Sequence, residues 1–264
     1  MSGHHDFIFP KYPHLPAPDW KKLEQRLLDE EWVIPAVGRD VPEIALRDLH
    51  FSLGRLSERH LDFDPTWRTT GDLIAAHVAA RALPNDVPVI HDQTVAQAVA
   101  MLECHGIALT DWQCFDAASS TWCSAQYRPG PEFIRFLDRE IFDPGRDTLA
   151  MMLLEFDGDH PFVSAGENTF EPRLPGSGEE LVELPPHGTY VDFIGAAYED
   201  LNAQWVDPAT GHAYRIHDLD WQGGLGIGRR FLRFNDFDGG DLDVIASELG
   251  KLVGQPMAWC HRHL

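Results

Sequence analysis

A few of the chain's 14 histidines and 42 acidic residues are spaced as in metal or acid–base sites. His261-Arg262-His263 is a His-x-His pair, and on a β-strand this spacing puts both imidazoles on one face. His212 and the segment 217–220 (His-Asp-Leu-Asp) offer further ligand types, but nothing in the sequence brings these segments together. Neither a His-Glu-x-x-His motif nor a Cys–His zinc spacing occurs. We therefore predict no metal and no cofactor.

Two loops resemble ligand-binding motifs without completing them. Residues 223–230 (GGLGIGRR) have the glycines and arginines of a phosphate cradle, but the flanks predict a loop and then a strand, where a helix should follow. Residues 236–243 (DFDGGDLD) suggest a calcium loop, but Gly240 and Ser247 occupy positions that need oxygen-rich ligands. We expect a bulged strand entry at the first loop and a helix N-cap at the second.

No motif for nucleophilic catalysis is present. The chain lacks Gly-x-Ser-x-Gly and Ser-x-x-Lys, and its 42 acids make any single carboxylate pair uninformative. The cysteines, at 104, 114, 123 and 260, form no Cys-x-x-Cys pair, and the first residues lack the basic and apolar regions of an export signal. We therefore predict no catalytic residue, reduced thiols and a cytoplasmic location.

Charge narrows the classes of partner. The net charge is −21, and only 4 of the 21 basic residues are lysines. Such a field repels phosphate backbones and anionic membranes and attracts basic surfaces. The only dense basic cluster, Arg229, Arg230 and Arg233, is opposed by the surrounding charge, and no run of about 18 apolar residues exists. We therefore expect neither nucleic acids nor membranes as partners.

The acids cluster within residues 155–200, which hold 11 acids and one base, Arg173. This cluster is either a solvated face or an interaction surface, and we favour a surface for a basic protein. Aromatic anchors would supply much of the binding energy. The predicted contact residues are Glu155, Asp157, Asp159, Glu167, Glu171, Glu179, Glu180, Glu183 and Asp192, with Trp205 and Trp221 as anchors.

These features favour an inhibitor or immunity-type protein that neutralises a basic partner such as a toxin. The alternative is a hydrolase of unrecognised class that uses Asp or Glu with His, with or without a metal. A scaffold subunit and a nucleic-acid mimic remain further alternatives. Regular carboxylate spacing on the folded surface would favour the mimic.

Periodicity predicts a helix-rich first half. Residues 1–18, rich in proline and aromatics, suggest an extended arm on the surface. Capping signals and apolar spacing then predict four helices, separated by short strands. The predicted helices begin near residues 19, 71, 94 and 131, the last with an apolar face of Phe133, Phe136, Leu137 and Ile141, and the strands cover 32–35, 87–90 and 107–109.

Hairpin patterns dominate the second half. The loop 207–211 (DPATG) between apolar runs predicts a hairpin of 203–206 with 212–216. Residues 163–188 are the best loop or linker, and 149–156 are a buried strand or short helix. Strands are predicted at 190–198, 231–234 and 257–261, with a helix over 242–252. We predict an α+β fold with mostly antiparallel sheets, divided into an arm (1–18), a helix-rich subdomain (19–146) and a strand-rich subdomain (147–264).

Overall fold

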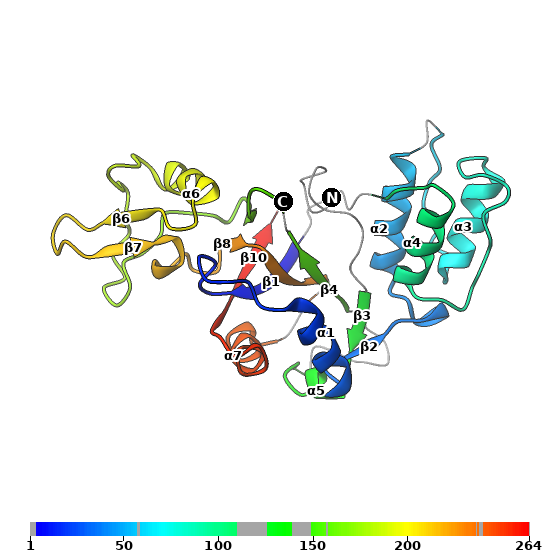
Figure 1. The fold of residues 1–264 in the computed structure, drawn as a ribbon, viewed down its shortest axis with the longest axis horizontal. Helices are drawn as coiled ribbons and strands as arrows, with labels where there is room; N and C mark the ends of the chain where they lie inside the picture. Colours follow the sequence, from blue (N-terminus) through cyan, green and yellow to red (C-terminus); the bar gives the residue numbers. More distant parts are fainter. Residues whose placement is uncertain are drawn as a thin grey trace. The chain divides into compact units, whose positions relative to one another are not determined.

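The computed structural model describes residues 4–56, 59–109, 126–138, 149–156, 158–235, 237 and 240–263. The chain forms two compact units (Figure 1). We call Met1–Leu23, Phe156–Arg233 and Asp241–Leu264 the terminal unit, because it holds both chain ends. We call Glu24–Glu155 and Phe234–Gly240 the helical unit. Helices and mostly antiparallel strands confirm the predicted α+β class.

The two chain ends pair with each other in the terminal unit. Strand β1 (His4–Pro10) runs antiparallel to β10 (Met257–His263), with His4 opposite His263. On its other side β1 neighbours β9 (Arg230–Asn235). Phe7, Ile8 and Phe9 are at most 1% exposed. The expectation of a surface arm is therefore wrong for residues 4–10, whereas residues 11–18 are half-buried or exposed and form no helix or strand, as expected of such an arm.

Helix α7 (Leu242–Val253) packs against β1 and β10 (Figure 1). Asp241 caps it by accepting from the backbone N–H groups of Asp243 and Val244 at 3.0 and 3.1 Å. Gly254 ends it in the left-handed conformation, at φ 81°. The predicted helix and the N-cap role of an acid at 241 are confirmed, while Asp236 and Asp238 lie outside the described residues.

Two small sheets complete the terminal unit. Strand β5 (Phe162–Ala165) pairs with β8 (Leu225–Gly228), and β6 (Gln204–Val206) pairs with β7 (Ala213–Arg215). The hairpin around 207–211 is confirmed, since the Gly211 N–H donates to the Asp207 carbonyl at 2.8 Å. The glycine-rich segment leads into β8 and not into a helix, as expected for a strand entry. A short 3₁₀ turn, Ile216–Asp218, follows β7.

Residues 190–198 were predicted as a strand, and the structure shows helix α6 (Tyr190–Glu199). Thr189 and Asp192 form a capping box, with the Asp192 N–H donating to the Thr189 hydroxyl and the Asp192 carboxylate accepting from the Thr189 N–H at 2.9 Å. Phe193 and Ala197 face a core with Trp205 and Ile227. Residues 163–165 belong to β5, and residues 166–188 form the predicted loop. Both ends lie in the terminal unit, so this segment does not link the two units.

Three helices surround the main core of the helical unit (Figure 1). They are α2 (Glu43–Gly54), α3 (Thr70–Ala79) and α4 (Val95–Cys104). The capping boxes Thr69–Asp72 and Thr94–Gln97 are both present, which confirms the predicted helix starts. Helix α2 was not predicted.

Strands β2 (Val33–Pro35), β3 (Gln126–Pro129) and β4 (Ala150–Glu155) pair antiparallel in chain order within the helical unit. The run 149–156 is therefore mainly a strand. The predicted strand 87–90 is a loop in which Val89 and Ile90 are each 42% exposed, and no strand covers 107–109. Helix α5 (Pro131–Ile134) ends sooner than its predicted apolar face, and Ile141 lies outside the described residues.

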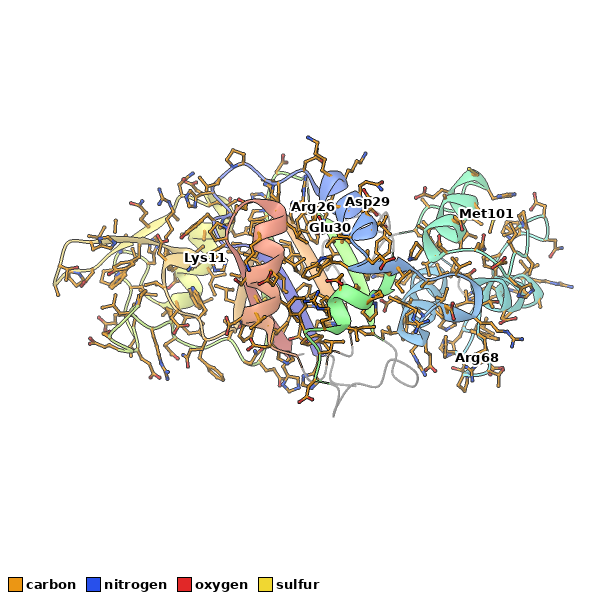
Figure 2. The ribbon with its side chains drawn as sticks, turned by 90° about the horizontal axis from the view of Figure 1, so that it is seen from below. Lys11, Arg26, Asp29, Glu30, Arg68 and Met101 are labelled. Carbon is orange, nitrogen blue, oxygen red and sulfur yellow. The ribbon has the colours of Figure 1, made fainter. Side chains whose placement is uncertain are left out.

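Helix α1 (Trp20–Asp29) confirms the first predicted helix, and the division between the units falls inside it, after Leu23. Its apolar face buries Trp20 and Leu27. The polar residues Arg26, Asp29 and Glu30 gather near its C-terminal end (Figure 2), where Arg26 pairs with Glu30 at 2.6 Å.

Candidate functional site

The predicted acidic surface is largely exposed. Asp159, Glu167, Glu179, Glu180, Glu183 and Asp192 are exposed in the terminal unit, and Glu171 is half-buried there. Glu155 is half-buried and belongs to the helical unit, and Asp157 lies outside the described residues. Asp192 is engaged by the α6 capping box, whose hydrogen bonds lower the pKa of its carboxyl group. We use "acidic segment" below for residues 167–192.

The two tryptophans predicted as anchors lie in the interior. Trp205 is 2% exposed and stacks on Tyr214 with ring centroids 5.6 Å apart. Trp221 is 6% exposed, and its indole N–H donates to the Ile216 carbonyl at 2.5 Å. Trp205 therefore stabilises the fold and offers no exposed face to a partner. The prediction that Trp205 is an anchor is wrong. A partner can contact Trp221 only through a pocket that this residue lines.

Three large apolar side chains are exposed within the acidic segment, and the sequence analysis missed them. Phe170, Val182 and Val191 are 61%, 69% and 59% exposed. Phe170 and Val182 each precede a glutamate in a loop, whereas Val191 falls within the run 190–198 that was predicted as a strand.

Backbone pairing folds the acidic segment back on itself. Arg173 bridges Glu180 antiparallel, and the Leu181 N–H donates to the Pro172 carbonyl at 2.9 Å. The Tyr190 hydroxyl donates to the Thr169 carbonyl at 3.4 Å and ties the start of α6 to the same place. The acidic segment thus carries three exposed apolar side chains as well as exposed carboxylates.

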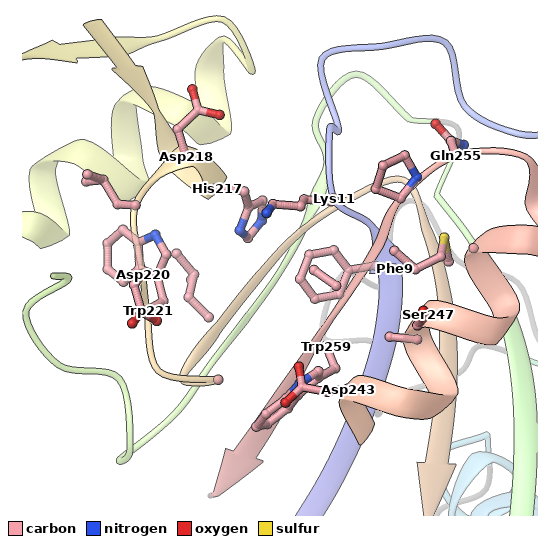
Figure 3. A pocket seen from close by; sticks show the side chains of 18 of the residues that line it. Phe9, Lys11, His217, Asp218, Asp220, Trp221, Asp243, Ser247, Gln255 and Trp259 are labelled. Carbon is pink, nitrogen blue, oxygen red and sulfur yellow. The ribbon is translucent and has the colours of Figure 1, made fainter. Parts of the chain in front are cut away.

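A pocket of about 970 Å³ lies beside the acidic segment, within the terminal unit (Figure 3). Its lining includes Trp221 and Asp220 on one side, Trp259 and Asp243 on the other, and Pro175 from the acidic segment. Arg173 and Asp220 exchange two backbone hydrogen bonds, at 2.7 and 3.0 Å, which join the acidic segment to the pocket wall.

On one side of the pocket, the Trp259 indole is positioned by a hydrogen bond and by close packing against Gly223. The Trp259 indole N–H donates to the Asp243 carboxylate at 2.8 Å. A Cβ at position 223 would lie 2.4 Å from Cζ3 of Trp259, and the φ of Gly223 is +74°, so glycine is needed there for both space and backbone conformation. The glycine-rich segment thus serves the packing of this indole.

A nearly buried histidine lines the same pocket. His217 is 8% exposed, and its Nε2 accepts the Ile227 backbone N–H at 3.2 Å. That bond requires the ring proton to sit on Nδ1, which makes no hydrogen bond to the described part of the chain. Burial lowers the pKa of His217 to about 4, so the ring is neutral near pH 7.

The His-x-His pair meets a carboxylate and a third histidine from the N-terminal strand. The His261 Nδ1 lies 2.8 Å from the Asp6 carboxylate, and its Nε2 lies 3.0 Å from the His4 Nδ1. His263 stacks on His4 with ring centroids 4.3 Å apart. The prediction that His261 and His263 share a face is confirmed, since both contact His4. A carboxylate that holds Nδ1–H leaves Nε2 basic, which is the arrangement of a general base.

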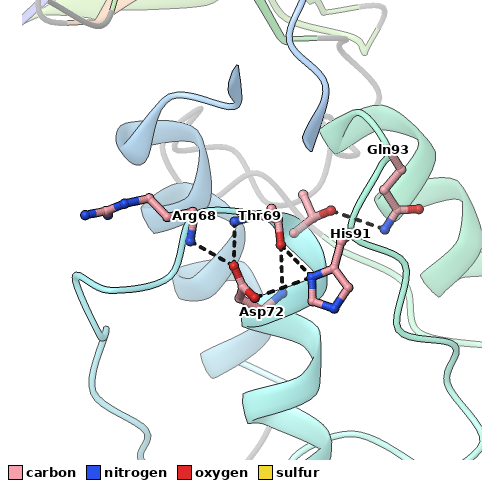
Figure 4. Close-up of polar contacts among 6 residues, drawn as sticks. Arg68, Thr69, Asp72, His91 and Gln93 are labelled. Atoms are coloured by element: carbon pink, nitrogen blue, oxygen red, sulfur yellow. Dashed lines mark hydrogen bonds and ion pairs between the residues drawn. The ribbon is translucent and has the colours of Figure 1, made fainter. Parts of the chain in front are cut away.

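A second Asp–His cluster, at the start of α3, caps a helix and does not form a proton relay (Figure 4). The Thr69 hydroxyl lies 2.9 Å from the His91 Nδ1, and the Asp72 carboxylate lies 3.4 Å from the same nitrogen. A catalytic triad needs the carboxylate and the hydroxyl on opposite ring nitrogens. Gln93 supports the cap by donating to the Thr70 hydroxyl at 3.2 Å.

Among the described residues, no group of three His, Cys, Asp or Glu side chains is placed to hold a metal ion. Cys104 and Cys260 are free thiols, and Cys114 and Cys123 lie outside the described residues. No described helix is both long and apolar enough to cross a membrane. The chain matches no family model, no curated protein and no solved structure. Fold and site together define an α+β protein with an acidic surface and an aromatic pocket.

Proposed function

We propose that this chain is an acidic cytoplasmic binding protein, of the inhibitor or immunity type, that neutralises a basic protein such as a toxin. The observation that carries the proposal is the acidic segment. That segment holds exposed glutamates together with the exposed side chains of Phe170, Val182 and Val191. Apolar side chains that desolvate on contact supply affinity, and a rim of one charge supplies orientation and a fast encounter.

The charge of the whole chain supports the same partner class. A net charge of −21 attracts a basic protein over a distance of about 10 Å at 0.1 M salt, and the attraction weakens as salt rises. Arg173, the one base in residues 155–200, is paired with Glu180 at 2.9 Å, which leaves the segment strongly acidic.

The test is charge reversal with a matched control. One variant carries Lys in place of Glu167, Glu179, Glu180 and Glu183, and a control carries Lys in place of four exposed acids of the helical unit, Asp29, Asp86, Asp92 and Glu103. Both variants change the net charge equally. We expect tagged wild-type protein and the control to retain a basic protein from the native host at low salt, and the segment variant to lose it. Equal retention by all three proteins would contradict the proposal.

The second candidate function, a hydrolase that uses Asp and His, is favoured by one observation, the Asp6–His261–His4 chain. His261→Asn would remove the base while keeping a side chain that can donate to Asp6. His60→Asn is the control, because His60 lies 2.9 Å from Asp62 but both side chains are about nine-tenths exposed. The hydrolase candidate predicts ester or phosphate hydrolysis that only His261→Asn abolishes. No hydrolysis by the wild-type protein would remove this candidate.

A further inference from the structure

The pocket beside the acidic segment offers an unusual combination of groups. Each of two facing sides has an indole next to a carboxylate, Trp259 with Asp243 and Trp221 with Asp220 (Figure 3). One oxygen of Asp243 accepts from Trp259, and one oxygen of Asp220 accepts the Gln222 N–H at 2.8 Å. The second oxygen of each carboxylate has no hydrogen-bond partner among the residues that the structure describes. The pocket therefore presents free acceptors beside aromatic faces.

His217 adds a donor that is not matched within the protein. Its Nδ1–H lacks an acceptor in the described ranges, and the side chain is more than nine-tenths buried while lining the pocket. The Nδ1 atom itself is accessible from the pocket, so a ligand or water there can accept from it. This donor matches an occupant that carries an acceptor such as a peptide carbonyl.

The charges of the pocket select a cation. Lys251 is paired with Glu248 on α7, and Lys11 extends beside His217, away from Trp259 and Asp243 (Figure 3). A carboxylate next to an indole matches a guanidinium, which is planar, always charged, stacks on aromatic rings and donates two parallel hydrogen bonds. A lysine ammonium has neither the flat face nor the paired donors.

We propose that this pocket receives an arginine side chain from the basic partner, with the guanidinium over the Trp259 indole and paired with the Asp243 carboxylate. A backbone carbonyl next to that arginine accepts from the Nδ1–H of His217, and Asp220 faces the guanidinium from the other side. The inference rests on the proposed function for the source of the arginine. The acidic segment then orients the partner, and the pocket holds one residue of it.

The test uses a probe that needs no partner, N-acetyl-arginine methylamide, with binding followed by calorimetry. The control ligand is the blocked citrulline, which has the same shape without the charge. We expect the wild-type protein to bind the arginine probe at least about tenfold more tightly than the citrulline probe. No binding of the arginine probe, or equal binding of the two, would overturn the inference.

Matched variants locate the binding. Asp243→Asn and Trp259→Phe should each weaken the arginine probe by about tenfold or more. Asp241→Asn is the control, because this residue is on the same helix and outside the pocket lining, and asparagine caps a helix as well as aspartate does. Undiminished binding by Asp243→Asn would contradict the assignment. If Asp243→Asn fails to fold, Trp259→Phe and the comparison with the citrulline probe still test the arginine site.

The two proposals can fail separately. If the arginine probe binds at the pocket but no basic protein is captured, the arginine site is supported and the proposed function is contradicted. If a basic protein is captured through the glutamates of the acidic segment but the arginine probe does not bind, the proposed function is supported and the arginine site is contradicted.

Discussion

Acidification should destabilise the helical unit through one buried pair of histidines. His77 on α3 is 1% exposed, and its Nε2 lies 3.0 Å from the Nδ1 of His50 on α2. The Nδ1 of His77 has no hydrogen-bond partner in the described part of the chain. Burial, and then the charge of His50, lower the pKa of His77 to about 4. A proton added at low pH would have to sit inside the core.

The direction of this pH effect follows from the linkage between proton binding and folding. In the unfolded chain the pKa of histidine is about 6.5, so below that pH the unfolded state binds more protons than the folded state. The stability contributed by keeping His77 neutral is therefore fully present above pH 6.5 and is lost as the pH falls toward the folded pKa of about 4. For these two values the loss between pH 7 and pH 5 is about 2 kcal/mol.

The perturbation is His77→Gln, which keeps an amide able to donate or accept near the position of Nε2 and removes the titrating ring. The assay is hydrogen exchange of the α3 amides at pH 7 and pH 5, corrected for the intrinsic pH dependence of exchange. The wild-type protein should lose about 2 kcal/mol more protection than the variant over this interval. His105→Gln, an exposed change at the end of α4, should behave as wild type. Equal losses in wild type and His77→Gln would refute the reasoning.

Three further substitutions test the packing. Gly223→Ala places a methyl group 2.4 Å from Trp259 and should cost about 1–3 kcal/mol in urea unfolding, whereas an unchanged midpoint would contradict the described contact. Thr69→Ala removes the α3 cap and should lower stability by about 1 kcal/mol in thermal unfolding, whereas Thr69→Ser should restore it. Phe9→Ala, at a fully buried position near the C-terminal end of β1, should cost about 3–5 kcal/mol, compared with little for Lys11→Ala at an exposed position. Similar effects of the two substitutions would contradict the burial of β1.

The sequence predicted elements with local signals and failed where distant contacts decide. The capping boxes at Thr69 and Thr94 gave correct helix starts, because the cap and its partner are three residues apart. The same box at Thr189 was missed, because the Tyr-, Val- and Ile-containing run after it is typical of a strand. Helix α2 was hidden by the polar residues Asp48 and His50, which are buried inside it.

The candidate site shows the same limit. Alternation along 261–263 predicted that two histidines share a face, but their partners Asp6 and His4 come from the other end of the chain. The acids at 155–200 were visible as composition, whereas the pocket needs β10, α7 and the turn after β7 to meet. Local pattern identified residue types, and tertiary pairing determined which of them became neighbours.

The central claim is that the acidic segment binds a basic protein. The most direct measurement is the affinity of the captured protein for wild type, for the variant with lysines at Glu167, Glu179, Glu180 and Glu183, and for the helical-unit control, each at low and high salt. Wild type and control should bind with similar affinity that weakens as salt rises, while the segment variant should bind far more weakly at both salt concentrations. Equal affinity of the segment variant and the control would contradict binding through the acidic segment.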